Sequence, residues 1–327
     1  MEKIDFVITW VDGNDKKWRK EKNKYSKLNE NDDFRYRDWD NLKYLFRGIE
    51  KFTPWVNKVY FVTYGHLPTF LNTTNKKLVI VNHSDFIDKK YLPTFSSHTI
   101  ELNLYKINGL NEKFVYFNDD TFILKNMKEE DFFKNGMPRD SAVISAIAPN
   151  GNDFFRNILF NNIQVINKHF KKSTVIKKYP FKWFNLKYHK HLLKTILAMP
   201  YNCFLGLHYF HDPSSFLKSS YEEVWKLEHD LLDRTCIHKF RDRDDVNQYV
   251  IKDYQKVKGT FIPRNTNTTA FMSVGKDNKK IIESIRKRKY KMICINDSAD
   301  DINFEKTKNE INKELDNILP EKSSFEK

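Results

Sequence analysis

The stretch FVYFNDDTFI, residues 114–123, runs from aromatic and apolar residues into Asn118, Asp119 and Asp120 and then becomes apolar again. Its first part predicts a buried strand that ends on two adjacent carboxylates. Two neighbouring carboxylates repel each other and are costly to bury, so such a pair needs a cation or a shared proton unless both acids point into water. Acidic pairs are common in water-facing turns, so this pair alone indicates a cation site only weakly.

Further apolar or β-branched runs end in polar residues in the same way, at residues 4–10, 58–63 and 77–82. Between the first two, apolar residues at helical spacing predict an amphipathic helix over 39–52. Strands separated by helices or loops predict an α/β fold, a Rossmann-like, mostly parallel sheet flanked by helices. Ligands bind beyond the carboxyl ends of such strands, so Asp12, Thr63 and the Asp119–Asp120 pair should lie near one rim of the sheet.

The rest of the chain divides by composition. We expect one domain over residues 1–327, consisting of an α/β core (1–150), a lysine-rich and aromatic helical insertion (151–200), a region that ends in a closing strand (201–300) and a charged tail (301–327). The tail predicts a surface helix with a frayed end. The polar stretch 14–38 predicts no regular element.

Composition restricts the partners and the compartment. The chain has 57 Lys and Arg against 43 Asp and Glu, a net charge of +14 that suits nucleic acid, an anionic membrane surface or phosphorylated substrates. No helix-turn-helix, zinc-finger or RNP-like pattern accompanies this charge, so we expect no nucleic-acid partner. Three widely spaced cysteines support neither a disulfide framework nor a zinc site. No run of about 18 apolar residues and no leader pattern occurs, which predicts a cytoplasmic protein.

Several motifs offer candidate chemistry. Neither a P-loop nor a G-x-G-x-x-G motif is present, but magnesium held by one or two carboxylates and substrate phosphates needs neither. The stretch GLHYFHDPSSF, residues 206–216, contains His208 and His211. Either histidine could act as a base, or both could simply be packed side chains. The stretch CIHKFRDRDD, residues 236–245, contains His238, Arg241 and Arg243, which could equally form a surface salt-bridge network.

Taken together, these blocks resemble the Stealth family, the bacterial capsular polysaccharide phosphotransferases related to the catalytic part of the animal lysosomal-enzyme N-acetylglucosamine-1-phosphotransferase. They occur in the order of the family's four conserved regions and span nearly the whole chain. The blocks are IDFVITWVDGND (4–15), LKYLFRGIEKFTPWVNKVYFVTYGHLPTFL (42–71), YLPTFSSHTIELNLYKINGLNEKFVYFNDD (91–120), HDP (211–213) with FRDRDD (240–245), and CIND (294–297).

The resemblance implies a GT-A-type fold and an enzyme of capsular or cell-surface polysaccharide biosynthesis. Such an enzyme moves hexose 1-phosphate, or N-acetylhexosamine 1-phosphate, as an intact unit from a nucleotide-diphosphate sugar to a glycan hydroxyl. A phosphodiester forms and a nucleoside monophosphate leaves. The glycan acceptor is expected to be lipid-linked, and the positive charge suggests peripheral contact with an anionic membrane at its inner face.

The resemblance also implies roles for single residues. Its NDD motif falls on Asn118, Asp119 and Asp120, its H-x-P histidine on His211 and its downstream arginine on Arg241. The implied catalytic residues are His211 as general base, Arg241 on the phosphoryl oxygens, and Asp120. The implied ligands of Mg or Mn are Asp119, Asp120 and Asp297, and the implied substrate-binding residues are Trp10, Asp12, Gly13, Arg47 and Asn118. Asp212 would orient His211.

Two departures from the family pattern are Gly48, where serine is usual, and Tyr64, where a polar residue is usual. Two rival functions remain. A conventional metal-dependent glycosyltransferase shares the sheet and the acidic ligands but releases a nucleoside diphosphate, and a polyanion-binding module without catalysis would use the basic surface alone. The identity of the released nucleotide separates the first rival from sugar-phosphate transfer, and salt-dependent nucleic-acid binding would favour the second.

Overall fold

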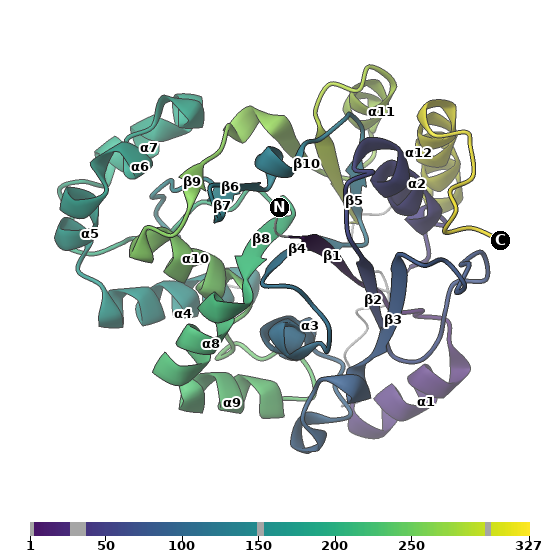
Figure 1. Ribbon diagram of the computed structural model, residues 1–327, viewed down its shortest axis with the longest axis horizontal. Helices are drawn as coiled ribbons and strands as arrows, with labels where there is room; N and C mark the ends of the chain where they lie inside the picture. Colours follow the sequence, from purple (N-terminus) through teal and green to yellow (C-terminus); the bar gives the residue numbers. More distant parts are fainter. Residues whose placement is uncertain (1–2, 27–36, 149–153, 298–301) are drawn as a thin grey trace.

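A computed structural model describes residues 3–26, 37–148, 154–297 and 302–327. Its main sheet has the strand order β3-β2-β1-β4-β8 (Figure 1). Neighbouring strands among the first four are parallel, and β8 joins the edge antiparallel to β4. This confirms the predicted α/β class with a mostly parallel sheet. The strands are β1 (Ile4–Thr9), β2 (Val59–Thr63), β3 (Leu78–Asn82), β4 (Lys113–Asn118) and β8 (Ser214–Leu217).

The sequence of β1 shows why this sheet is covered on both faces. Alternate residues of a strand point to opposite faces, and here both sets are apolar. Phe6 and Ile8 belong to one core cluster and Val7 to another. The first cluster lies under α2 (Leu42–Phe52) and α12 (Phe304–Ile318), and the second lies under α3 (Ser97–Asn103), α8 (Lys218–Leu227), α9 (His229–Ile237) and α10 (Tyr249–Lys258).

A second sheet has the strand order β10-β11-β5, and its strand β5 directly follows the Asp119–Asp120 pair in the sequence. Its strands are β5 (Thr121–Ile123), β10 (Thr269–Ser273) and β11 (Met292–Asn296). The strand predicted before Asp297 is thus present. Because β4 ends at Asn118 and β5 starts at Thr121, the two aspartates lie at the junction of the two sheets. A third small sheet joins β6 (Phe133–Lys134), β7 (Met137–Asp140) and β9 (Ile262–Pro263).

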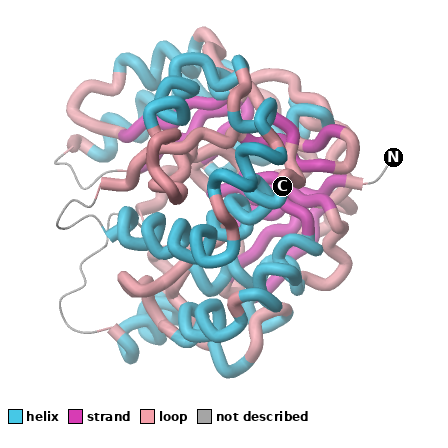
Figure 2. The backbone as a smooth tube through the Cα atoms, turned by 90° about the vertical axis from the view of Figure 1, so that its left-hand side faces the viewer, coloured by secondary structure: helices cyan, strands magenta, loops and turns pink. Residues whose placement is uncertain are grey.

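The predicted insertion is helical. Its elements are α4 (Phe154–His169), α5 (Lys172–Lys178), α6 (Pro180–Trp183), the 3-10 helix η6 (Leu186–His191) and α7 (Leu192–Leu197). They pack around a separate core that includes Trp183, Tyr188 and Phe204. In Figure 1 these helices occupy the left side of the molecule, which is the side that faces the viewer in Figure 2.

The polar stretch at 14–38 contains a helix that its sequence pattern did not predict, α1 (Lys16–Tyr25). Asp15 caps it by accepting a hydrogen bond from the Trp18 backbone at 2.7 Å, and the Trp18 side chain is buried. The remaining helices are α11 (Lys279–Arg286) and the 3-10 helices η2 (His83–Asp85), η3 (Lys89–Tyr91), η4 (Leu104–Lys106), η5 (Glu129–Asp131) and η7 (Thr266–Thr268). In the described ranges no helix is both long and apolar enough to span a bilayer.

The predicted frayed end of the tail is wrong. After α12, Phe325 is buried in the first core cluster, and Glu326 forms an isolated antiparallel bridge with Leu71. The Lys327 backbone N–H donates to the Phe70 carbonyl at 2.9 Å. Apolar burial and backbone pairing therefore hold the last residues against the α/β core.

Candidate active site

The Asp119–Asp120 turn is fixed by its position between the two sheets. The Asp120 carbonyl accepts a hydrogen bond from the Ile295 N–H of β11 at 2.9 Å, and Thr121 Oγ1 lies 3.3 Å from Asp120 Oδ1. The Asp119 side chain is exposed to solvent on one side, yet the protein around it desolvates its carboxylate. This desolvation and the adjacent Asp120 charge raise the pKa of Asp119 to about 7, and desolvation also raises the pKa of Asp120.

A further carboxylate, Asp38, lies near this pair. Its charge adds to the raised pKa of Asp119, and desolvation raises the pKa of Asp38 itself. In the described residues no Lys or Arg forms an ion pair with Asp119 or Asp120. Because uncompensated carboxylates that open to solvent can accept a cation, this arrangement fits Mg²⁺ or Mn²⁺ held by one or two carboxylates and substrate phosphates.

Asp297 does not complete the predicted set of metal ligands. Its carboxylate accepts a hydrogen bond from Trp39 Nε1 at 3.1 Å and lies 3.9 Å from Arg37. No group of three or more His, Cys, Asp or Glu side chains in the described part of the chain is arranged to hold a metal. The structure therefore leaves Asp119 and Asp120 as the candidate cation ligands and gives Asp297 a partner of opposite charge.

The loop after β1 carries three of the predicted substrate-binding residues. The Trp10 ring stacks on Phe61, with centroids 5.8 Å apart and planes at 29°. The Asp12 backbone N–H donates to His66 Nε2 at 2.7 Å, and desolvation lowers the pKa of His66, which keeps this nitrogen available as an acceptor. The Gly13 carbonyl accepts from the Arg19 side chain. This loop is thus pinned between α1 and the segment that follows β2.

Arg241 lies in a loop that is tied to the start of α3. Arg241 Nη2 donates to Ser97 Oγ at 2.8 Å. The fully buried Asp245 accepts from His98 Nδ1 at 2.9 Å and from His238 Nδ1 at 2.7 Å. Its carboxylate also accepts from the Asp242 backbone at 2.8 Å, which closes the loop. The RDRDD motif is therefore an ordered loop that presents the exposed Arg241, rather than a loose surface network.

His211 lies before β8 in a left-handed backbone conformation, with φ of 49°. Its ring stacks on Phe271 of β10, with centroids 4.1 Å apart and planes at 24°. Desolvation, reinforced by the charge of Lys252, lowers the pKa of His211 to about 4. Near neutral pH the imidazole is consequently unprotonated and able to accept a proton.

The second sheet connects His211 with the aspartates. Phe271 is the register partner of Cys294 on β11, and Cys294 is the register partner of Thr121, which follows Asp120. No hydrogen bond or ion pair between described residues links Arg241 with His211 or with the aspartate pair. The structure thus joins His211 and Asp120 through the three neighbouring strands β5, β11 and β10, while Arg241 is held by a hydrogen bond to Ser97 of α3.

Asp212 does not orient His211. Its carboxylate forms ion pairs with Lys252, at 3.0 Å, and with Arg264. Both cations belong to a buried group of six charged side chains, here named the Asp212 network, which consists of Asp140, Asp212, Asp253, Lys252, Lys256 and Arg264. Within it, Lys256 lies 3.6 Å from Asp140 and 3.3 Å from Asp253. Because the network holds Asp212, it also restrains the left-handed backbone of the neighbouring His211.

Comparison with known proteins decides the family. Models of Stealth protein conserved region 1 and conserved region 2 match residues 2–30 and 35–140. The chain is 43% identical to the capsular polysaccharide phosphotransferase WcwK of Streptococcus pneumoniae, over 100% of this chain and 99% of that protein. The chain belongs to the Stealth family. It is also 38% identical to the exopolysaccharide phosphotransferase cps2G of Lactiplantibacillus plantarum, over 99% of this chain and 96% of the relative.

Among solved structures, the galactosyltransferase LgtC in complex with donor and acceptor sugar analogs matches with a TM-score of 0.35 and 11% identity, over 82% of this chain and 75% of that one. This similarity is too low to define a shared fold. The fold class of this Stealth chain therefore rests on its own sheet. The two matching regions contain the Trp10 loop and the Asp119–Asp120 turn, whereas the assignment of the blocks at His211, Arg241 and Asp297 to the later regions remains a prediction.

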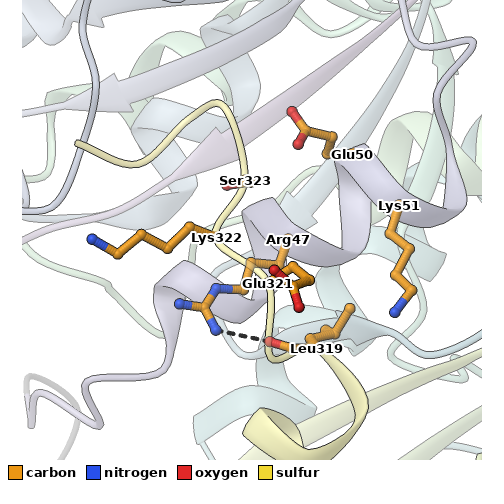
Figure 3. Close-up of a pocket in the computed structure, with 7 residues that line it drawn as sticks. All are labelled: Arg47, Glu50, Lys51, Leu319, Glu321, Lys322 and Ser323. Carbon is orange, nitrogen blue, oxygen red and sulfur yellow. Dashed lines mark hydrogen bonds between the residues drawn. The ribbon is translucent and has the colours of Figure 1, made fainter.

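Arg47, predicted to contact substrate, has partners within the protein in this Stealth chain, and its substrate contact stays a prediction. Arg47 is buried on α2, where its Nε and Nη2 each donate to the Glu326 carboxylate at 2.9 Å. Its Nη1 donates to the Leu319 carbonyl at 2.8 Å (Figure 3). The pocket drawn in Figure 3 is lined by Arg47 and residues around the tail, and it includes no other predicted site residue. Arg47 fastens the tail to α2.

The two departures from the Stealth pattern have structural explanations. A Cβ at Gly48 would come within 2.9 Å of the Ile123 carbonyl, so glycine lets α2 pack closely on β5. Tyr64 donates a hydrogen bond to Glu21 of α1 and stacks on Phe95, whose ring in turn stacks on Phe240 beside Arg241. Tyr64 therefore joins the Trp10 side of the site to the Arg241 loop.

Sequence reasoning missed Asp38, His66, His98 and Asp245. Asp245 holds His98 across 147 residues of sequence, and Asp12 meets His66 across 54. Asp245 was visible only as one acid of the FRDRDD block. Asp38 follows a polar stretch with no periodicity, so nothing in the pattern marked it.

Proposed function

We propose that this Stealth chain is a sugar-1-phosphate transferase of capsular or other cell-surface polysaccharide synthesis. It would move hexose or N-acetylhexosamine 1-phosphate from a nucleotide-diphosphate sugar to a glycan hydroxyl and release a nucleoside monophosphate. The observation that carries this proposal is the 43% identity, over the whole chain, to a protein named as a capsular polysaccharide phosphotransferase. The uncompensated carboxylates and the unprotonated histidine support it chemically.

The aspartate turn would receive the diphosphate. Asp119 and Asp120 would hold Mg²⁺ or Mn²⁺, and that cation supplies charge neutralisation for the diphosphate when it is bound. Their carboxylates bind a cation only when deprotonated, so the raised pKa of Asp119 makes cation affinity increase as the pH rises toward and past about 7. Asn118, at the end of β4, and the Trp10–Gly13 loop would bind the nucleotide end of the donor.

His211 would accept the proton of the attacking acceptor hydroxyl. Its pKa of about 4 leaves it unprotonated at neutral pH, as a general base requires, and such a base typically contributes roughly 100-fold to 10,000-fold. Arg241 is exposed and donates a hydrogen bond to Ser97. Its guanidinium would bind the transferring phosphoryl oxygens, because its forked geometry can contact two oxygens at once.

The bond between the sugar C1 and its oxygen is never broken in this reaction. The anomeric configuration of the donor sugar is therefore retained without a double displacement. The finer parts of the proposal are a lipid-linked glycan as acceptor and a cytoplasmic enzyme that contacts the membrane from its inner face. The net charge of +14 supports such a contact with anionic lipid.

The released nucleotide tests the proposal. The purified chain is incubated with Mg²⁺ or Mn²⁺, a glycan acceptor and a panel of nucleotide sugars, and the nucleotide product is identified. A nucleoside monophosphate together with a new phosphodiester is expected. Both should be lost in His211→Ala and kept in His229→Ala, a control at an exposed histidine of α9. A nucleoside diphosphate would instead indicate a conventional glycosyltransferase and contradict the roles given to His211 and Arg241.

A further inference from the structure

The helical insertion carries an unusual combination of charge and exposed apolar side chains. Between Asp153 and Asp212 the sequence contains no Asp or Glu but ten Lys or Arg. Within this segment, α6, η6 and α7 expose large apolar residues, with Leu186 at 86%, Phe181 at 83% and Leu197 at 67% exposure. We name this region the 180–197 surface, and its exposed large apolar residues and lysines are Phe181, Phe184, Leu186, Lys187, Lys190, Leu193, Lys194, Ile196 and Leu197.

The exposed apolar residues are not needed for the core of the insertion. That core is made by other side chains of the same helices, including Trp183 and Tyr188, which are fully buried. Two hydrogen bonds fix these helices around the core: Tyr188 OH donates to the Lys182 carbonyl at 2.6 Å, and Lys182 Nζ donates to the Phe261 carbonyl at 2.8 Å. Large exposed apolar patches mark interaction sites, so the 180–197 surface needs an external partner.

We propose that the 180–197 surface docks this chain on an anionic lipid bilayer. Phe181, Leu186, Leu193 and Leu197 would enter the headgroup region, and Lys187, Lys190 and Lys194 would lie against lipid phosphates. Exposed Leu and Phe among lysines, without any acid, is the pattern of surfaces that lie in the membrane interface.

Other occupants fit the surface less well. A second copy of the same surface would bring lysines against lysines with no acid to compensate them. A nucleic acid or an acidic polysaccharide would contact the lysines but give Leu186, Leu193 and Leu197 no apolar environment. A bilayer satisfies both kinds of side chain, because acyl chains and phosphates lie within a few ångströms of each other.

The position of this surface places the candidate active site near the membrane. Phe155 of α4, in the same insertion, lies against His211 with ring centroids 5.9 Å apart. His191, at the end of η6, stacks on His208 at 5.1 Å, three residues before His211. A chain docked through the 180–197 surface would therefore hold the His211 side of the molecule beside the bilayer. The docking itself does not rest on the proposed reaction.

Vesicle sedimentation tests the apolar part of this inference. The whole chain is mixed with neutral phosphatidylcholine vesicles or with vesicles containing about 30% phosphatidylglycerol, at about 150 mM salt. Binding to the anionic vesicles only is expected. Leu186→Ser with Leu197→Ser should weaken it at least about tenfold. The matched control, Leu227→Ser with Ile237→Ser, changes two exposed apolar residues elsewhere, at 39% and 51% exposure, and should bind as the wild type does.

A charge-reversal pair tests the basic part. Changing Lys187, Lys190 and Lys194 to Glu should weaken anionic vesicle binding on the order of 100-fold, because each lysine near the surface contributes about fivefold. Changing Lys276, Lys279 and Lys280 to Glu alters net charge equally but lies near α11, and should have a much smaller effect. Thermal unfolding of each variant checks that it is folded.

Four results would overturn the inference. They are no binding of the wild type to anionic vesicles, equal loss in the control variants, unchanged binding in the leucine variant, or a dimer in sedimentation velocity that the leucine variant abolishes. RNA binding that survives the leucine variant, without vesicle binding, would identify a polyanion site instead. Because these assays contain no nucleotide sugar, their outcome is independent of the transferase proposal.

Discussion

The Asp119–Asp120 turn and the Asp212 network both hold carboxylates in dense protein surroundings, but they are compensated in different ways. Asp140, Asp212 and Asp253 are each less than a tenth exposed and have Lys252, Lys256 or Arg264 within ion-pair distance. Asp119 reaches solvent, and no Lys or Arg of the described ranges forms an ion pair with it or with Asp120.

The pKa directions express this difference. Burial tends to raise the pKa of Asp140, but the charges of Lys252, Lys256 and Arg264 outweigh it, so its pKa is lowered. At Asp119, desolvation and a neighbouring acid act in the same direction, and its pKa rises to about 7. The carboxylates of the Asp212 network are neutralised by buried cations of the chain and stabilise the fold. The carboxylates of the Asp119–Asp120 turn have no such partner among the described residues and are suited to bind a cation from solution.

The largest expected effect is on catalysis. Asp119→Asn with Asp120→Asn removes both candidate cation ligands, and the transfer rate should fall on the order of 10,000-fold, because each lost electrostatic contact at a reacting phosphate costs roughly 100-fold or more. Stability should be unchanged or slightly higher, since the repulsion is also removed. Steady-state rates and urea unfolding measure the two quantities. A loss of stability in this variant would show that the aspartates are structural.

The Asp212 network should show the opposite behaviour. Asp212→Ala leaves Lys252 and Arg264 buried with less compensation, so the free energy of unfolding should fall by about 3–5 kcal/mol. Urea unfolding at neutral pH provides the measurement. Asp230→Ala, at a fully exposed aspartate of α9, is the control and should change stability little. A stable Asp212→Ala variant would remove the distinction between the two groups.

A cation should distinguish the two groups directly. Mg²⁺ at about 100 times its dissociation constant should increase the free energy of unfolding of the wild type by about 2.7 kcal/mol. The same addition should not stabilise Asp119→Asn with Asp120→Asn, while a conservative change in the buried network, Asp253→Asn, should retain the response. Thermal or urea unfolding with and without the metal reports it. Equal stabilisation of all variants would place the cation elsewhere.

The smallest expected effect is the pH dependence of stability. Between about pH 4 and 7, folded Asp119 retains a proton that the unfolded chain has released, so its contribution makes stability fall as the pH rises. Water that reaches Asp119 weakens this slope without reversing its sign. Asp140 acts oppositely, and its stabilising contribution is lost only as the pH falls below about 3.8. The free energy of unfolding of the wild type minus that of Asp119→Asn, measured in urea from pH 4 to 8, should fall as the pH rises. A difference that rises with pH would contradict this prediction.

Local patterns predicted the strands and the helical insertion, because apolar runs and periodicities lie within a few residues of sequence. The strand predicted to end before Asn118 appears as Lys113–Asn118, with the two aspartates directly after it. Roles that depend on distant partners could not be predicted. Trp39 contacts Asp297 across 258 residues of sequence, and Arg47 contacts Glu326 across 279. Arg47, predicted to contact substrate, therefore forms an ion pair within the protein.

The fate of the donor's sugar-linked phosphorus distinguishes transfer of sugar 1-phosphate from transfer of the sugar alone. A nucleotide sugar labelled with ³²P at the phosphorus attached to the sugar is incubated with the chain and a glycan acceptor, and the label is followed into glycan and nucleotide. The label should enter the glycan, in a bond that mild acid treatment and phosphomonoesterase reveal as a phosphodiester, and the donor anomer should be retained. Label that stays with the nucleotide while unlabelled sugar enters the glycan would contradict sugar 1-phosphate transfer.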